Sequence, residues 1–273
     1  MYLRLVLFFA FLLELYCGIG LADEPELKWG HLKGKISVAG DIPKLEPLIK
    51  AGDPQVRDAA VCAAQEIPDP SFLVDAKSRG IANAALYLKK SPNHVHPLLA
   101  TVAAKEMELQ VKGCSYEPHV MFVRVGQKIR LKSQDAAVHN AHIFSSRSAR
   151  FCQIINPLDP AGEIHEMLSA EPTPVGVYCD IHPWMSARWL VLDHPYAAIT
   201  GRDGTFEIKN LPVGVHEFSL WHERPGFVTP AANSKTYRVE VKPDETTQLD
   251  IIIPVERFFT AKEQNGQPNK KPS

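Results

Sequence analysis

The sequence predicts an all-β protein that consists of two β-sandwiches. Its apolar residues recur in short runs that alternate with polar residues, which is the pattern of half-buried strands. Turn signals such as Asp203-Gly204 separate these runs at intervals typical of sandwiches. One stretch, residues 45–65, shows a modest helical pattern, with helix-forming residues at positions 59–64. Strands therefore dominate the predicted structure.

The predicted strands follow one another along the whole chain. A strand at residues 32–40 ends in a glycine turn, residues 84–88 read as a further strand, and residues 107–111 alternate cleanly. A long hydrophobic run at 120–131 reads as a hairpin, and the further predicted strands are 71–74, 188–192, 196–200, 205–208, 215–221, 236–241 and 247–253.

Composition limits the classes of function. The chain has 273 residues, of which 45% are hydrophobic, so it can bury one large core or two small ones. Its formal net charge of −1 favours neither nucleic acid nor an anionic membrane as a partner.

The first residues read as a signal peptide at 1–22. Arg4 supplies the charged region, residues 5–13 form an apolar core too short to span a bilayer, and Gly20-Leu21-Ala22 offers small residues for cleavage. The mature chain is expected to start near Asp23 and to be secreted or periplasmic. A retained anchor is the alternative, because Glu14 interrupts the apolar run. No later segment is apolar enough to cross a membrane.

The candidate metal ligands lie in one short loop and on one remote strand. Cys179, His182 and Met185 stand at Cys-x-x-His-x-x-Met spacing. A thiolate, an imidazole and a weak thioether suit copper, and a blue-copper site needs one further histidine. His139, which follows the hydrophobic run at 120–132, supplies it. The predicted copper ligands are therefore His139, Cys179, His182 and Met185.

Three other cysteines remain after removal of the signal peptide. In an oxidising compartment two of them should pair, and we expect a disulfide between Cys62, in the helical stretch, and Cys114, at the start of a strand. Cys152 is then unpaired. It is expected to be a buried apolar thiol, and the alternative is a thiol near the metal-binding loop.

Residues 106–195 resemble the cupredoxin family. Residues 112–131 look like its second and third strands, residues 135–140 look like the loop that carries the first ligand, and the ligand loop has amicyanin-like spacing. Residues 179–185 together with His194-Pro195-Tyr196 are similar to cupredoxin-containing proteins of the methylamine-utilisation type. The resemblance implies a Greek-key β-sandwich that holds one type 1 copper ion.

The C-terminal part resembles the carboxypeptidase-regulatory-like, or transthyretin-like, β-sandwich, on the motifs at residues 203–206 and 211–214. Residues 32–40 also look like the first strand of such a sandwich, so the cupredoxin part is either inserted into it or shares a face with it. The expected divisions are a signal peptide (1–22), a cupredoxin-like domain with an N-terminal extension (23–195), the carboxypeptidase-regulatory-like sandwich (196–256) and a disordered tail (257–273).

Three neighbours of the ligands have expected supporting roles. Asn140 can hydrogen-bond to the thiolate or to the ligand loop and so tune the metal. Pro183 and Trp184 would stiffen the loop and shield it from water, and would form an apolar patch at the edge of His182 where a redox partner docks. Trp184 is equally open to the interpretation of ordinary core burial.

These features predict an electron carrier and not an enzyme. The ligand set suits one-electron transfer to a redox partner protein. Multicopper oxidases and copper nitrite reductases have histidines beside their type 1 copper cysteine, whereas Cys179 is flanked by Tyr178 and Asp180. The sequence also has no nucleophile elbow and no phosphate-binding glycine loop. The alternative is an extracellular module that binds a protein or a glycan, with a structural or copper-storing cupredoxin domain.

Overall fold

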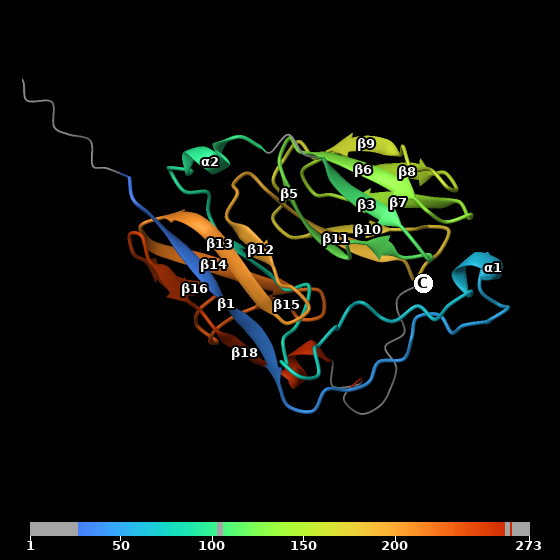
Figure 1. The fold of residues 1–273 in the computed structure, drawn as a ribbon, viewed down its shortest axis with the longest axis horizontal. Helices are drawn as coiled ribbons and strands as arrows, with labels where there is room; N and C mark the ends of the chain where they lie inside the picture. The colour runs from blue at the N-terminus through green and yellow to red at the C-terminus, as the bar shows by residue number, and fades with distance from the viewer. Residues whose placement is uncertain (1–26, 103–105, 260–262, 264–273) are drawn as a thin grey trace, which may run out of the picture.

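The computed structural model describes residues 27–102, 106–259 and 263, and strands dominate them (Figure 1). The all-β fold class predicted from the sequence is confirmed. The strands pack as two sandwiches of two sheets each, which we call the first sandwich (β3 to β11) and the second sandwich (β1, β2 and β12 to β18). Figure 1 shows the first sandwich, in green and yellow, beside the second, whose strands are mostly blue, orange and red.

The first sandwich encloses a core of its own. One sheet has the strand order β5-β11-β10-β7-β8, and the other has the order β4-β3-β6-β9. Leu131, Ile143 and Trp189 from these sheets are buried in one cluster. The strands are β3 (Met107–Val111), β4 (Tyr116–Glu117), β5 (Val120–Arg124), β6 (Lys128–Ser133), β7 (His139–Phe144), β8 (Phe151–Ile155), β9 (Glu163–Glu166), β10 (Val175–Tyr178) and β11 (Ser186–Leu192).

The second sandwich has a separate core. In one sheet β1 pairs with β13, β17 and β18, and in the other β14 pairs with β2, β15 and β16 while β12 pairs with β2. The strands are β1 (Trp29–Ala39), β2 (Ala85–Leu88), β12 (Ala197–Ile199), β13 (Thr205–Pro212), β14 (Gly214–His222), β15 (Gly226–Val228), β16 (Tyr237–Val241), β17 (Thr246–Gln248) and β18 (Ile251–Pro254).

The pairing of β1 and β2 differs from the expected division at residue 195. Both strands belong to the second sandwich, so the first sandwich is inserted between β2 and β12. The pattern of β1 explains its place, because Leu32 and Ile36 point into the second core. Gly34 permits the close pairing, since a Cβ atom there would lie 1.8 Å from the carbonyl oxygen of Leu249.

The turn between β12 and β13 forms as the Asp-Gly motif predicts. Gly204 has a φ of 81°, and the Asp203 carboxylate accepts the N–H of Thr205 at 3.0 Å. The predicted strand at residues 71–74 is wrong, because there only Val74 forms an isolated bridge, with Ile81.

The prediction of a disordered tail at 257–273 is wrong for its first residues. A 3-10 helix, η1 (Val255–Phe258), closes the second core, and the Phe258 ring lies 5.0 Å from that of Phe72. Burial of this aromatic ring orders the chain past residue 257. Residues 264–273 and the predicted signal peptide at 1–22 lie outside the described residues. Within the described part of the chain, no helix has the length and apolar character needed to span a membrane.

Residues 41–70, which we call the covering segment, run from the second sandwich to the first, and their central part packs on the first core. The helical stretch predicted at 45–65 contributes one short helix, α1 (Ala59–Cys62), at the far end of the first sandwich (Figure 1). Ile49 and Ile67 join the core of the first sandwich. A disulfide links Cys62 to Cys114, the pair expected from the sequence, with the two Cα atoms 5.2 Å apart. A second short helix, α2 (Pro97–Ala100), precedes β3.

The two sandwiches share a buried contact surface. Tyr87, Leu190 and Trp221 form an apolar cluster between them. Beside it, the Glu223 carboxylate binds the guanidinium of Arg188 at 2.7 Å and the imidazole of His119. Burial would raise the pKa of Glu223, but the hydrogen bond to His119 and the nearby charges lower it to about 2.

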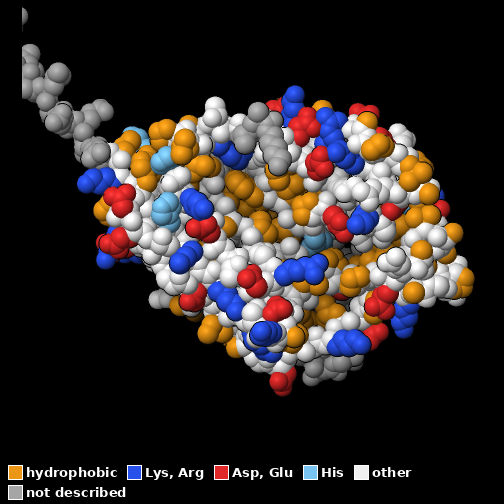
Figure 2. All heavy atoms as spheres, in the orientation of Figure 1, with side chains coloured by type: hydrophobic (Ala, Val, Ile, Leu, Met, Phe, Trp, Pro, Cys, Tyr) orange, Lys and Arg blue, Asp and Glu red, His pale blue; other side chains and the backbone are white. Residues whose placement is uncertain are grey.

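The surface drawn in Figure 2 carries charges of both signs. Lysine and arginine side chains are intermixed there with aspartate and glutamate, as the formal net charge of −1 leads one to expect. That face therefore offers no broad field of one sign to steer a polyanion.

We expect Glu223→Gln to destabilise the protein by about 3 kcal/mol at pH 7, since a pKa lowered from 4.5 to about 2 is worth roughly that much. The carboxylate contributes this stability above its unfolded pKa and loses it as pH falls toward 2. Urea unfolding at pH 7 and at pH 3 measures this effect. Between these two pH values the free energy of unfolding should fall less in the variant than in the wild type. Glu217→Gln, in an exposed pair with Lys89, is the control and should change little.

We expect removal of the disulfide, by Cys62→Ala with Cys114→Ala, to lower the free energy of unfolding by about 4 kcal/mol, because the bond closes a loop of 52 residues. Proteolysis should then cut the covering segment first. Equal protease resistance of the oxidised and variant proteins would show that the apolar contacts of Ile49 and Ile67 hold the segment without the bond.

Candidate metal centre

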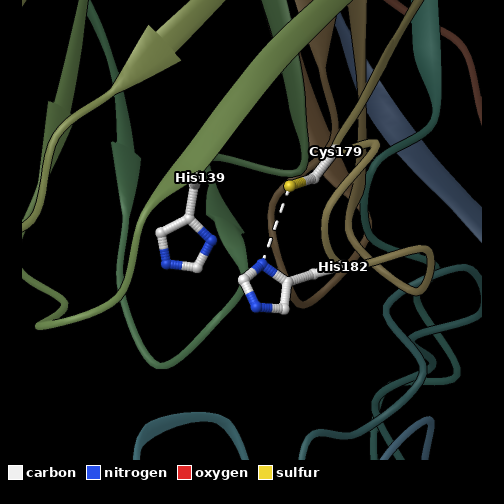
Figure 3. A group of neighbouring side chains, drawn as sticks. All are labelled: His139, Cys179 and His182. Atoms are coloured by element: carbon white, nitrogen blue, oxygen red, sulfur yellow. Dashed lines mark hydrogen bonds between the residues drawn. The ribbon is translucent and has the colours of Figure 1, made fainter. Parts of the chain in front are cut away.

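Three buried side chains bring metal-binding atoms together at one end of the first sandwich. His139 begins β7, Cys179 directly follows β10, and His182 lies in the loop that leads into β11. Their donor atoms all lie within 4.8 Å of one another. Figure 3 shows both imidazole rings turned toward the Cys179 sulfur, which is 3.7 Å from the Nδ1 atom of His182.

Strand pairing fixes where these side chains meet. Strand β10 lies antiparallel between β7 and β11, so its end reaches the start of β11 through one tight loop. Within that loop the N–H of Met185 donates to the carbonyl of His182 at 2.9 Å, and the N–H of Cys179 donates to the carbonyl of Met185. The loop is thus closed by its own backbone, and its spacing alone sets the relative positions of Cys179 and His182.

Each imidazole has a carboxylate on the side away from the sulfur. His182 Nε2 lies 3.0 Å from Oδ2 of Asp58, and His139 Nε2 lies 3.3 Å from Oδ2 of Asp135. A carboxylate at Nε2 selects the tautomer whose Nδ1 lone pair is free, which is the arrangement typical of metal-binding histidines. Both rings therefore offer Nδ1 to the space beside Cys179.

The residues fit a metal ion by two criteria. An ion about 2.3 Å from sulfur and about 2.0 Å from nitrogen sets these two atoms roughly 3.5 to 3.7 Å apart at tetrahedral to trigonal angles. The distance of 3.7 Å between Cys179 and His182 agrees. In addition, the buried ring nitrogens of His139 make no hydrogen bond of good geometry within the described residues. A buried polar atom without a hydrogen bond is costly unless it binds something else.

The electrostatics of the centre favour a thiolate. Burial would raise the pKa of Cys179, but the nearby imidazoles of His139 and His182 and the backbone N–H of Asn140 lower it to about 5. A thiolate is the form of cysteine that binds metal ions. The centre is therefore prepared for a cation before any cation enters.

Asp135 also organises the strand ends around His139. Its two oxygens accept the N–H groups of Gly113 and Cys114, each at 2.7 Å. Burial would raise the pKa of Asp135, but the nearby His139 imidazole and these N–H groups lower it below its ordinary value. Cys114, Asp135 and His139 also form a group of possible metal-binding atoms. The sulfur of Cys114 is held in the disulfide, so it is no thiolate ligand.

The structure places the remaining predicted site residues around this centre. Met185 is buried in the same core cluster as Cys179, and its role as a ligand stays a prediction. Asn140 accepts the N–H of Asp180 at 2.8 Å and so anchors the ligand loop, one of the two roles expected for it. Pro183 is exposed, whereas Trp184 is half-buried and donates its indole N–H to the carbonyl of Cys114 at 3.1 Å.

Two expectations differ from the structure. The edge of His182 is not a surface for docking, because the ring is 0% exposed and Asp58 of the covering segment binds it. Cys152 is exposed and not buried, and it lies near the metal-binding loop, which was the alternative interpretation. In strand β8 its alternation with Phe151 and Gln153 turns it toward solvent.

Sequence reasoning missed both carboxylates. Asp135 lies four residues before His139, a spacing that could have suggested a partner. Asp58 lies 124 residues from His182, and no local pattern connects the two.

Comparisons with known proteins show limited similarity. No family model matches the sequence, and no curated protein matches it. Similar solved structures include an oxidised amicyanin variant (20% identity over 34% of this chain and 88% of that chain, TM-score 0.29). A copper-containing nitrite reductase from Thermus scotoductus is also similar, with 21% identity over 34% of this chain and 25% of that chain and a TM-score of 0.27. A third is a purple cupredoxin from Nitrosopumilus maritimus, with 17% identity over 32% of this chain and 100% of that chain and a TM-score of 0.27. Similarities of this size do not assign the chain to a family or to a function.

We expect Asp58→Asn to weaken metal binding by roughly 10- to 100-fold, because an amide holds the His182 ring less firmly than a carboxylate does. Competition with a chromophoric chelator measures the affinity. Glu66→Gln changes an exposed carboxylate in the same segment and serves as the control. An affinity equal to that of the control would mean that Asp58 does not support the centre.

Proposed function

We propose that this chain is a secreted, mononuclear type 1 copper protein that carries single electrons between redox partners and is not an enzyme. The observation that supports the proposal most is the convergence of one thiolate and two imidazoles, all buried, on one point. This donor set with Met185 as a weak further ligand is the one that type 1 copper prefers. Copper, when bound, supplies a one-electron redox couple stable in both oxidation states.

The chain's own residues suit rapid electron transfer because they hold the donors still. Asp58 and Asp135 fix the two rings, and Asn140 fixes the loop that carries the sulfur. Donors that cannot move keep one geometry for both oxidation states, so little rearrangement accompanies the transfer of an electron. Burial of His139, Cys179 and His182 also keeps water from the ligand positions, which disfavours catalysis on a bound substrate.

The covering segment changes where a redox partner would approach. The His182 ring is buried, and its Nε2 contacts the carboxylate of Asp58, whose side chain is 43% exposed. We therefore expect the partner to dock over the segment near Asp58. The resemblance to methylamine-utilisation proteins suggests a redox enzyme as that partner.

Secretion and the identity of the second sandwich belong to the same proposal. The Cys62–Cys114 disulfide fits an oxidising compartment outside the cytoplasm. The second sandwich, with its Asp-Gly hairpin, is proposed to be carboxypeptidase-regulatory-like. In the alternative function, an extracellular module that binds a protein or a glycan, this sandwich would be the working part and copper would be structural or stored.

We expect the purified protein to turn blue with Cu(II) and to bleach with ascorbate, because a thiolate bound to Cu(II) absorbs visible light by charge transfer. Cys179→Ser should abolish the colour and leave the circular dichroism of the strands unchanged. A Cys179→Ser protein that stayed blue would refute the ligand assignment. A colourless wild-type protein that binds copper would favour the storage alternative.

A further inference from the structure

A second group of metal-binding side chains lies beside the candidate centre and is accessible to solvent. His142 and Cys152 are direct cross-strand neighbours on β7 and β8, and Asp180 follows Cys179 at the end of β10. Their donor atoms also lie within 4.8 Å of one another. The side chains of His142 and Asp180 are 31% and 55% exposed, and Cys152 is exposed. The proposed electron carrier makes no use of this group.

The distances within the group suit one ion. His142 Nδ1 lies 3.1 Å from both carboxylate oxygens of Asp180, and the Cys152 sulfur lies 3.7 Å from Oδ2 of Asp180. Tetrahedral ligands of zinc would have nitrogen and oxygen about 3.3 Å apart and sulfur and oxygen about 3.5 Å apart. The two pairs that include Asp180 are therefore within a few tenths of an ångström of these separations.

The group is held in place by neighbours that do not themselves bind the ion. The side-chain N–H₂ of Asn140 donates both to the Cys152 sulfur at 2.9 Å and to Oδ2 of Asp180 at 2.7 Å. The His142 ring stacks on Phe144 with ring centroids 4.2 Å apart. Asn140 thus positions the Cys152 sulfur and one oxygen of Asp180 through one amide, and it also anchors the ligand loop of the first centre. Exposed side chains that meet by chance lack such support.

We propose that His142, Cys152 and Asp180 form a second metal site for a divalent cation of the zinc type, with its fourth position open to water. Sulfur, nitrogen and carboxylate oxygen are the ligands that zinc takes in proteins, and three protein ligands plus a water are typical of an open site. A bound cation would also protect Cys152, since an exposed free thiol in an oxidising compartment is prone to oxidation or to pairing between chains.

A cation in this second site would act on the charge of the first centre. Asp180 adjoins Cys179 in the chain, so a cation bound by Asp180 would place positive charge next to the thiolate. That charge would favour the reduced state of a copper ion and raise its reduction potential. This consequence rests on the proposed function, whereas metal binding by the second group does not.

The test uses Co²⁺ as a coloured substitute for zinc in a chain that begins at residue 23. In a Cys179→Ser background, with Cys62 and Cys114 joined in a disulfide, Cys152 is the one thiol left in the described residues. We expect Co²⁺ to produce a sulfur-to-metal charge-transfer band. Adding Cys152→Ser should abolish the band, and adding His142→Ala or Asp180→Asn should weaken binding at least about tenfold. His94→Ala, an exposed histidine elsewhere, should change nothing.

A second measurement covers the case in which Cys179→Ser fails to fold. Because Cys152 is exposed, Cys152→Ser should fold normally, and equilibrium dialysis with Zn²⁺ should then find one bound ion fewer than in the wild type. The proposal is overturned if the band is absent from the folded Cys179→Ser protein, if His142→Ala leaves it unchanged, or if the zinc stoichiometry does not fall. Failure of the blue colour with copper would leave these results intact, so the two proposals fail separately.

Discussion

The structure depends on the burial of two imidazoles and a thiolate in an otherwise apolar core. Taking such groups out of water is costly unless each is paired and hydrogen-bonded. The molecule meets this requirement by placing Asp58 behind His182 and Asp135 behind His139, while backbone N–H groups and both rings stabilise the thiolate of Cys179. The ring nitrogens of His139 make no hydrogen bond of good geometry among the described residues, and this unmet requirement is what marks the cluster as a candidate metal centre.

The unusual path of the chain serves the same requirement. The covering segment leaves the second sandwich after β1 and brings Asp58 to the first, and the chain beyond it returns to form β2. Its disulfide to Cys114 and the buried Ile49 and Ile67 hold it there. The first sandwich is in turn held between β2 and β12, with Glu223 joining the two cores through Arg188. The position of Asp58 therefore depends on how the covering segment packs on the first sandwich.

Much of the fold followed from local patterns. The alternation of β1, β3 and β14 and the Asp203-Gly204 turn were readable, because strand periodicity and turn chemistry act over a few residues. The partners of β1 and β2 were not, since an alternating strand fits either sandwich and only the complementary edges of β13 and β14 decide. Phe258 shows the same limit: the polar composition of the tail hid one aromatic ring that completes a core.

The sequence by itself determined the donor set, because Cys179 and His182 lie in one tight loop and their spacing fixes their relation whatever the rest of the chain does. It also identified Asn140 and the Cys62–Cys114 pair. Only the tertiary structure decided that Asp58 covers His182, that the proposed docking edge is closed, and that Cys152 joins His142 and Asp180 at the surface. Asp58 lies 124 positions from His182, and Cys152 lies 28 positions from Asp180; these contacts arise from sheet register and from the packing of distant segments, which local spacing does not encode.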